Sequence, residues 1–126
     1  MNLSEKVLTM ESQLLTCLQE NLRIPSVEGP AEKDAPYGIE VKKSLDHVLA
    51  AANALGFRTE NVDNHLGWCE YGEGEEMVAV LGHLDVVPAG DGWSFDPWGG
   101  EIPVMGFTPD GEYPVINGEK GIINAN

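Results

Sequence analysis

The sequence predicts a domain of the α/β class, in which two amphipathic helices precede a mixed sheet of short strands. In the first 55 residues, apolar side chains recur at steps of three or four, which is the spacing of one helix face. From Phe57 onward the apolar runs are short and turn residues separate them, which is typical of strands. At 126 residues we expect one domain, covering 1–126, with one hydrophobic core.

The two predicted helices lie on either side of a proline-rich loop. The first covers 3–22, because its apolar stripe continues to Leu22 and the residue before Pro25 is pushed out of helical geometry. A loop with three prolines is expected at 25–37. The second helix covers 38–55, and Gly56 just beyond it is suited to end it.

Three strands are predicted after the second helix, at 57–62, 66–71 and 77–81. Turn residues separate them, Asp63-Asn64 in the first gap and Gly72-Glu73-Gly74 in the second. The third strand is continuously apolar, which predicts a central strand covered on both faces.

Beyond this strand the pattern becomes irregular. Residues 86–103 show neither a helical period nor alternation, so we expect a loop. The remaining predicted elements are a short strand, a turn and a hairpin around Gly118, at 104–107, 108–111, and 113–117 with 121–124.

Charge and composition limit the partners. Seven basic and 21 acidic residues give a net charge of −14, which repels phosphate backbones and anionic lipids, so neither nucleic acid nor membrane is an expected partner. The first residues lack the basic start and unbroken apolar block of a secretory signal, and a cytoplasmic location is expected. Cys17 and Cys69 form no CxxC pair and are expected to be buried free thiols.

The candidate site lies at the end of the third predicted strand, where the apolar run is followed by His83 and Asp85. Ligands bind beyond the carboxyl ends of strands in open α/β sheets. Residues two apart in an extended chain point to the same side, so Asp85 can accept a hydrogen bond from the imidazole of His83 and fix its tautomer. On residues alone, this pattern is compatible with a metal site or with a capping or surface pair.

Three stretches carry a resemblance to a known family. VLGHLDVVPAGDGWSFDPW resembles the metal-site segment of the aminoacylase/carboxypeptidase group of di-zinc metallopeptidases. DNHLGWCEYGEG and GFTPDGEYPVINGEKG resemble an earlier and a later segment of its Xaa-His dipeptidase (carnosinase-like) branch, in the family's order. The resemblance implies a partial catalytic domain of a zinc peptidase that hydrolyses dipeptides or short peptides.

Residue roles follow from this resemblance position by position. His83 is implied as a ligand of one zinc ion, Asp110 as a carboxylate ligand of one of the two metals, and Asp85 as the catalytic-site residue that orients His83. Without the family, Asp110 in its Pro-Asp-Gly context would be a plain turn residue. In the family, two zinc ions and a glutamate activate a water that attacks the peptide carbonyl.

The chain departs from the family pattern between Asp85 and Asp110. Only 24 residues lie between them, whereas the family places there a bridging aspartate, a Glu-Glu pair, a long helix and further strands. We therefore expect an internal deletion near 98–103. The family's last metal histidine and its lid or dimerisation domain are also lacking, and Glu75-Glu76, which precedes His83, is expected to be a solvated turn pair.

Two hypotheses about function follow from these observations. A zinc peptidase needs three protein ligands, so we expect this chain alone to be an inactive dipeptidase fragment that binds zinc weakly. The alternative is a non-catalytic metal-binding or interaction fragment. An incomplete sheet leaves an apolar face or edge uncovered, which predicts self-association.

Several other residues have structural expectations. His47 and His65 lack metal-ligand spacing to His83 and are expected to be structural or surface residues. The aromatic residues of the 86–103 loop could form a binding platform, but anchoring of the loop is favoured; they are Trp93, Phe95 and Trp98.

Overall fold

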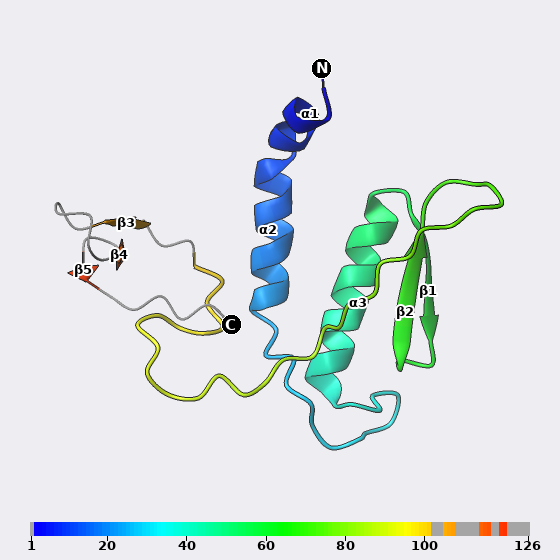
Figure 1. Cartoon of the computed structure of the whole chain (residues 1–126). Coiled ribbons are helices and arrows are strands. Elements are labelled where there is room, and N and C mark those ends of the chain that lie inside the picture. Colours follow the sequence, from blue (N-terminus) through cyan, green and yellow to red (C-terminus); the bar gives the residue numbers. More distant parts are fainter. Residues whose placement is uncertain (1, 102–104, 108–113, 117–118, 121–126) are drawn as a thin grey trace.

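The computed structural model describes residues 2–101, 105–107, 114–116 and 119–120 (Figure 1). Its helices are α1 (Leu3–Thr9), α2 (Glu11–Leu22) and α3 (Ile39–Ala54). Its strands are β1 (Arg58–Val62), β2 (Leu66–Glu70), β3 (Met105–Phe107), β4 (Pro114–Ile116) and β5 (Glu119–Lys120). The predicted α/β class is confirmed, with helices first and strands after them.

The predicted first helix is present but interrupted at Met10. Met10 has φ −99° and ψ 0° and serves as the C-cap of α1 and the N-cap of α2. Just before the break, the hydroxyl of Thr9 donates to the carbonyl of Lys6, a local hydrogen bond that competes with helix continuation. The end at Leu22 is as predicted, and a side-chain and main-chain capping box of Asn2 and Glu5 starts α1.

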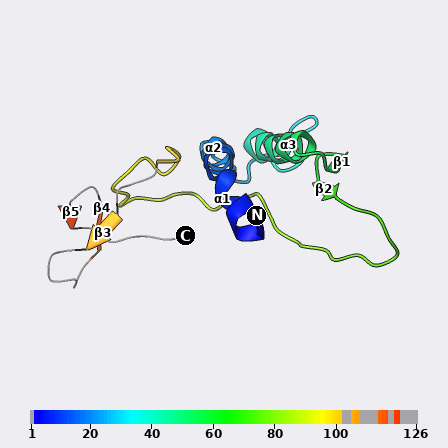
Figure 2. The same ribbon diagram turned by 90° about the horizontal axis from the view of Figure 1, so that it is seen from above.

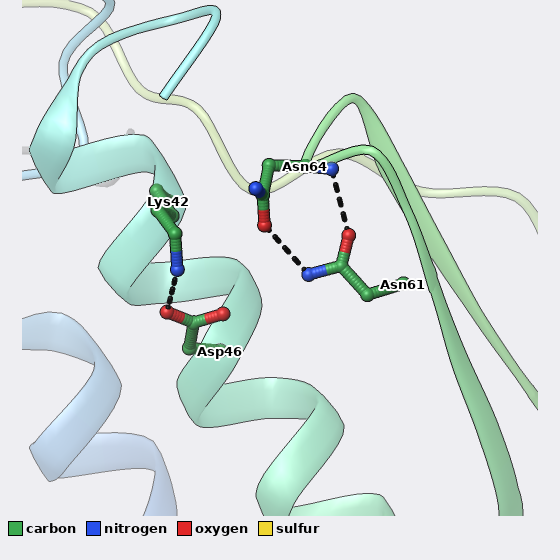
Figure 3. Close-up of polar contacts among 4 residues, drawn as sticks. All are labelled: Lys42, Asp46, Asn61 and Asn64. Atoms are coloured by element: carbon green, nitrogen blue, oxygen red, sulfur yellow. Dashed lines mark hydrogen bonds and ion pairs between the residues drawn. The ribbon is translucent and has the colours of Figure 1, made fainter. Parts of the chain in front are cut away.

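Helix α3 forms the centre of the described fold. Figures 1 and 2 show it between α2 on one side and the β1–β2 hairpin on the other. Its bounds agree with the predicted 38–55, since Gly38 is its N-cap and Leu55 its C-cap. On its surface the ammonium of Lys42 contacts the carboxylate of Asp46 at 2.5 Å (Figure 3), an exposed pair of small energetic weight.

Strands β1 and β2 form an antiparallel hairpin whose turn is Asp63-Asn64, as predicted. Both turn residues have positive φ, 51° and 57°, which asparagine and aspartate tolerate better than other non-glycine residues. The amide of Asn61 supports the turn, because it donates to the Asn64 side chain and accepts from the Asn64 main chain, both at 2.8 Å (Figure 3).

The predicted central strand at 77–81 is wrong. The segment has no regular structure, and its apolar side chains are almost fully exposed, as in Leu81 at 96%. Figure 2 shows the chain leaving β2, swinging away from the hairpin and returning. An apolar strand of this kind needs neighbouring strands and covering helices, and the described residues supply neither. Consequently 72–74 does not act as a hairpin turn.

The described strands form two separate antiparallel sheets, β1-β2 and β3-β4-β5, in place of the single mixed sheet that was predicted. β3 lies within the predicted 104–107. β4 and β5 form a hairpin on either side of 117–118, although β5 begins earlier than the predicted second arm. The predicted turn at 108–111 and the arm at 121–124 lie outside the described residues.

The 86–101 part of the predicted loop has no helix or strand, as expected, and it docks on α2. The side-chain amide of Gln19 donates to the carbonyl of Gly100 at 2.7 Å, and the guanidinium of Arg23 donates to Gly99 at 3.1 Å. Within the loop, the Trp93 indole donates to the carbonyl of Ala89 at 2.7 Å. The loop is thus held to α2 through the carbonyls of Gly99 and Gly100, and anchoring by Trp93, Phe95 and Trp98 stays a prediction.

The hydrophobic core of the described part is small. Its buried hydrophobic residues are Ala35 and Leu45, and two serines, Ser26 and Ser44, are equally buried. The apolar stripe of α1 and α2 stays largely exposed along its length, from Leu3 to Leu22. None of the helices in the described ranges has both the length and the apolar character that crossing a membrane requires.

Two glycines with positive φ allow a test of how closely the 25–37 loop packs against the start of α3. Gly38 has φ +95°, and a Cβ added there would lie 3.0 Å from the backbone nitrogen of Gly29, whereas Gly56 has φ +90° and open space around it. We expect Gly38→Ala to cost about 1–2 kcal/mol for its backbone conformation and about 1–3 kcal/mol more for the overlap. Gly56→Ala should cost only about 1–2 kcal/mol, for its positive φ, because no atom lies near the added Cβ.

Urea denaturation of both variants beside the parent measures the difference. Both positions carry a penalty for positive φ. Gly38, with ψ 158°, lies in a region that is essentially restricted to glycine, so its larger loss reports both that conformation and the close approach of the 25–37 loop to the start of α3. Equal losses of unfolding free energy would contradict that packing.

Candidate metal site at His83 and Asp85

The segment that carries His83 and Asp85 returns from the exposed 71–81 stretch and runs beside the loop that follows α2 (Figure 1). An isolated parallel bridge joins Val27 and Val86, and the main-chain N–H of Val86 donates to the carbonyl of Ser26 at 3.1 Å. The hydroxyl of Ser26 donates to the carbonyl of Leu84 at 2.7 Å. The segment is therefore held at its carboxyl end, although no sheet supports it.

The imidazole of His83 is engaged by Asp85 through one nitrogen. Nδ1 lies 2.9 Å from the main-chain oxygen of Asp85 and 3.3 Å from its carboxylate Oδ1. Both are acceptors, so the neutral ring carries its hydrogen on Nδ1 and keeps a lone pair on Nε2. Asp85 thus restrains the ring through the nitrogen that does not face a metal, with its main chain making the shorter contact.

Both side chains are accessible to solvent. His83 is 80% exposed and Asp85 57% exposed. They form part of the wall of a cavity of about 490 Å³ between α3, β2 and the returning segment. Its apolar wall comes mainly from α3, through Val41, Leu45, Val48 and Leu49. Further polar groups on the same cavity are Glu28, Tyr37 and His65.

The described residues do not complete a catalytic zinc site. Among them, no three His, Cys, Asp or Glu side chains lie close enough together to hold a metal ion. Of the predicted ligands, the described residues supply Nε2 of His83, because the carboxylate of Asp85 lies on the Nδ1 side of the ring. Catalytic zinc normally uses three protein ligands. Asp110, the other predicted ligand, lies outside the described residues.

The other two histidines take the structural positions that were expected. His47 on α3 places Nε2 3.1 Å from the carbonyl oxygen of Cys17 and 3.7 Å from its sulfur, and so links α3 to α2. His65 places Nδ1 3.0 Å from the carbonyl of Asp63 and meets the ring of Tyr37 edge-on at 5.6 Å.

Sequence reasoning missed that His65, Tyr37 and Glu28 share a cavity with His83. They come from the loop after α2 and from the β1–β2 turn, far from His83 in the sequence, so no spacing pattern connects them. Glu75 and Glu76 are exposed, in agreement with the expected solvated pair.

Both cysteines are free, as predicted, but their burial differs. Cys17 is half-buried between helices, whereas Cys69 on β2 is exposed, so the prediction of burial is wrong for Cys69.

Comparisons with known proteins found relatives that are named putative dipeptidases. No family model matches the chain. It is 31% identical to a Bacillus subtilis protein named "Putative dipeptidase YtjP", over all of this chain and 41% of the relative. Relatives from Staphylococcus aureus strains USA300 and N315, also named putative dipeptidases, are 30% identical over 94% of this chain and 39% of their own length. The chain therefore spans about two fifths of the length of the curated relatives it matches.

The alignments are longer than the chain itself. The alignment with the Bacillus relative runs over 190 positions, whereas this chain has 126 residues, so at least 64 aligned positions have no counterpart here. Since the alignment includes the whole of this chain, these positions fall between its matched residues.

The exposure of Cys69 gives a prediction about β2. We expect iodoacetamide to alkylate Cys69 several-fold faster than Cys17 in the native protein, because Cys17 is half-buried between α2 and α3. Peptide mass spectrometry over a time course measures both rates, and the urea-unfolded protein, in which both thiols are free, is the control. Faster reaction of Cys17 would indicate that β2 is covered in solution.

Proposed function

We propose that this chain is part of a metal-dependent dipeptidase of the di-zinc Xaa-His branch, whose complete form hydrolyses dipeptides or short peptides. The observation that carries the proposal is the His83–Asp85 pair, in which Asp85 engages Nδ1 and leaves Nε2 with its lone pair. A histidine restrained in this way is a ready zinc ligand. Similarity to proteins named putative dipeptidases supports the same class of substrate.

The proposed roles are those that the resemblance assigns. His83 and Asp110 are metal ligands, and Asp85 orients His83. Zinc, when bound with its full set of ligands, supplies the Lewis acid and the activated water of this class of hydrolase. The residues described here hold His83 in one tautomer but provide too few donors for that full set.

We further propose that residues 1–126 form a partial catalytic domain with an internal deletion near 98–103. Two observations support this. At least 64 positions of the Bacillus relative lack a counterpart, and the apolar 77–81 segment lacks the neighbours of a central strand. The chain alone accordingly binds zinc weakly and does not turn over peptides.

Zinc titration tests the metal assignment. Competition with a chromogenic chelator should give a Kd weaker than about 10 μM. The corresponding binding free energy is far smaller than the roughly 10–16 kcal/mol with which a complete structural site binds zinc. His83→Ala should abolish this binding, because it removes the restrained imidazole. His65→Ala is the matched control, since His65 lines the same cavity but is not a proposed ligand.

Two results would overturn this view in different ways. Unchanged zinc affinity in His83→Ala would remove the metal assignment. Cleavage of an Xaa-His dipeptide by the 126-residue protein, abolished by chelator and by His83→Ala, would show that the chain is itself a complete enzyme.

The alternative is an interaction fragment, and the exposed apolar segment is the observation that favours it. Val78 and Val80 are both 94% exposed, and the β1–β2 sheet that precedes them has two strands. Such a segment can add as a strand to a second copy of the chain.

Sedimentation velocity checks this self-association. The parent should show a mass above 13.6 kDa that rises with concentration. The double variant Val78→Ser with Val80→Ser should sediment as a monomer, because it removes the apolar side chains without changing charge. Leu3→Ser, an equally simple change on the distant α1, is the control. A monomeric parent would contradict the proposal.

A further inference from the structure

Ser26 is the residue through which the rest of the fold holds the candidate metal site. It lies in the loop after α2 and is 4% exposed. Its hydroxyl donates to the carbonyl of Leu84 at 2.7 Å, and its own carbonyl accepts from the N–H of Val86 at 3.1 Å. One buried residue therefore makes a hydrogen bond on each side of Asp85.

The position of these two bonds determines the orientation of Asp85. The carbonyl of Leu84 belongs to the planar peptide unit that ends at the nitrogen of Asp85, and the N–H of Val86 belongs to the unit that begins at its carbonyl. Fixing both units fixes the main chain of Asp85. Because Nδ1 of His83 contacts both the main-chain oxygen and Oδ1 of Asp85, the tautomer of His83 depends on that orientation.

Little else restrains this segment. Within the described ranges, no side chain other than that of Ser26 reaches residues 71–85 from outside to donate a hydrogen bond to them. Residues 71–83 are exposed and lack regular structure. The orientation of the pair therefore cannot come from a supporting sheet.

We propose that Ser26 is a positioning residue for the candidate metal site, acting on His83 through Leu84 and Asp85. The consequence for metal binding rests on the proposed function, whereas the consequence for the imidazole does not. Removal of the Ser26 hydroxyl frees the Leu84 carbonyl, allows its peptide unit to rotate and loosens the contact between Asp85 and Nδ1.

The chain contains a matched control in Ser44. It is 0% exposed, and its oxygen accepts a hydrogen bond from the side-chain amide of Asn21 at 3.1 Å. Ser44 thus joins α3 to α2 through a buried serine hydroxyl, and among the described residues its side chain makes no hydrogen bond to the His83 segment. Loss of general stability should affect Ser26→Ala and Ser44→Ala alike, whereas a positioning effect is confined to Ser26→Ala.

The first measurement is the two-bond ¹H–¹⁵N spectrum of the imidazole of His83 in labelled protein above the pH at which the ring is protonated. The parent and Ser44→Ala should show the single pattern of the Nδ1–H tautomer. Ser26→Ala should lose this pattern in favour of a mixture. Ser26→Thr, which keeps the hydroxyl, should retain it. An unchanged pattern in Ser26→Ala, or the same change in Ser44→Ala, would overturn the proposal.

The second measurement is zinc affinity. Loss of a group that orients a metal-binding histidine typically weakens metal binding 10–100-fold, so we expect Ser26→Ala to weaken it about 10-fold and Ser44→Ala to leave it unchanged. Equal affinities of Ser26→Ala and the parent would overturn the positioning role. If the His83 signals of the parent do not respond to zinc, the proposed function fails, and the tautomer pattern alone then decides the role of Ser26.

Discussion

The approach of β2 to α3 at Gly67 is the contact on which the described fold depends. A Cβ at Gly67 would lie 2.9 Å from methyl groups of Leu45 and Leu49, so the hairpin sits as close to the helix as a backbone without a side chain allows. Leu45 is one of the two buried hydrophobic residues among those that the structure describes. The cavity beside His83 also opens against this helix face, and so the packing at Gly67 shapes the wall of the candidate site.

The second constraint is the lack of neighbours for the 77–81 segment. A continuously apolar strand gains stability only when strands and helices cover it, and here the same residues face solvent. The uncovered segment leads straight into His83, which explains why that side chain is exposed. It also explains why the site depends on hydrogen bonds from the loop after α2.

Local patterns predicted the elements whose stability is local. The bounds of α3 followed from its apolar spacing and from Gly56 just beyond its end, and the Asp63-Asn64 turn followed from residues that tolerate positive φ. The relation of Asp85 to His83 was also predictable, because two residues of extended chain determine it. The break at Met10 was not, since it involves a side-chain bond of Thr9 that apolar periodicity does not register.

The failures concern elements that depend on distant parts of a chain. The apolar run at 77–81 was interpreted as a central strand because a complete sheet was assumed, and only the fold reveals that the described residues contain no partner for it. The cavity residues Tyr37 and His65 and the anchor Ser26 were missed for a related reason. Their positions near His83 result from how the loops are folded, and loops carry no periodic signal.

The difference between local contacts and long-range packing explains which parts of the site are present. The restraint of His83 by Asp85 spans two residues and its anchor at Ser26 needs only the end of α2, so both form without a complete sheet. The further metal ligands must come from separate strands or loops, and only long-range packing can place them beside His83. A chain that keeps the His83–Asp85 pair but lacks sheet neighbours for 77–81 therefore has an oriented histidine without a complete metal centre.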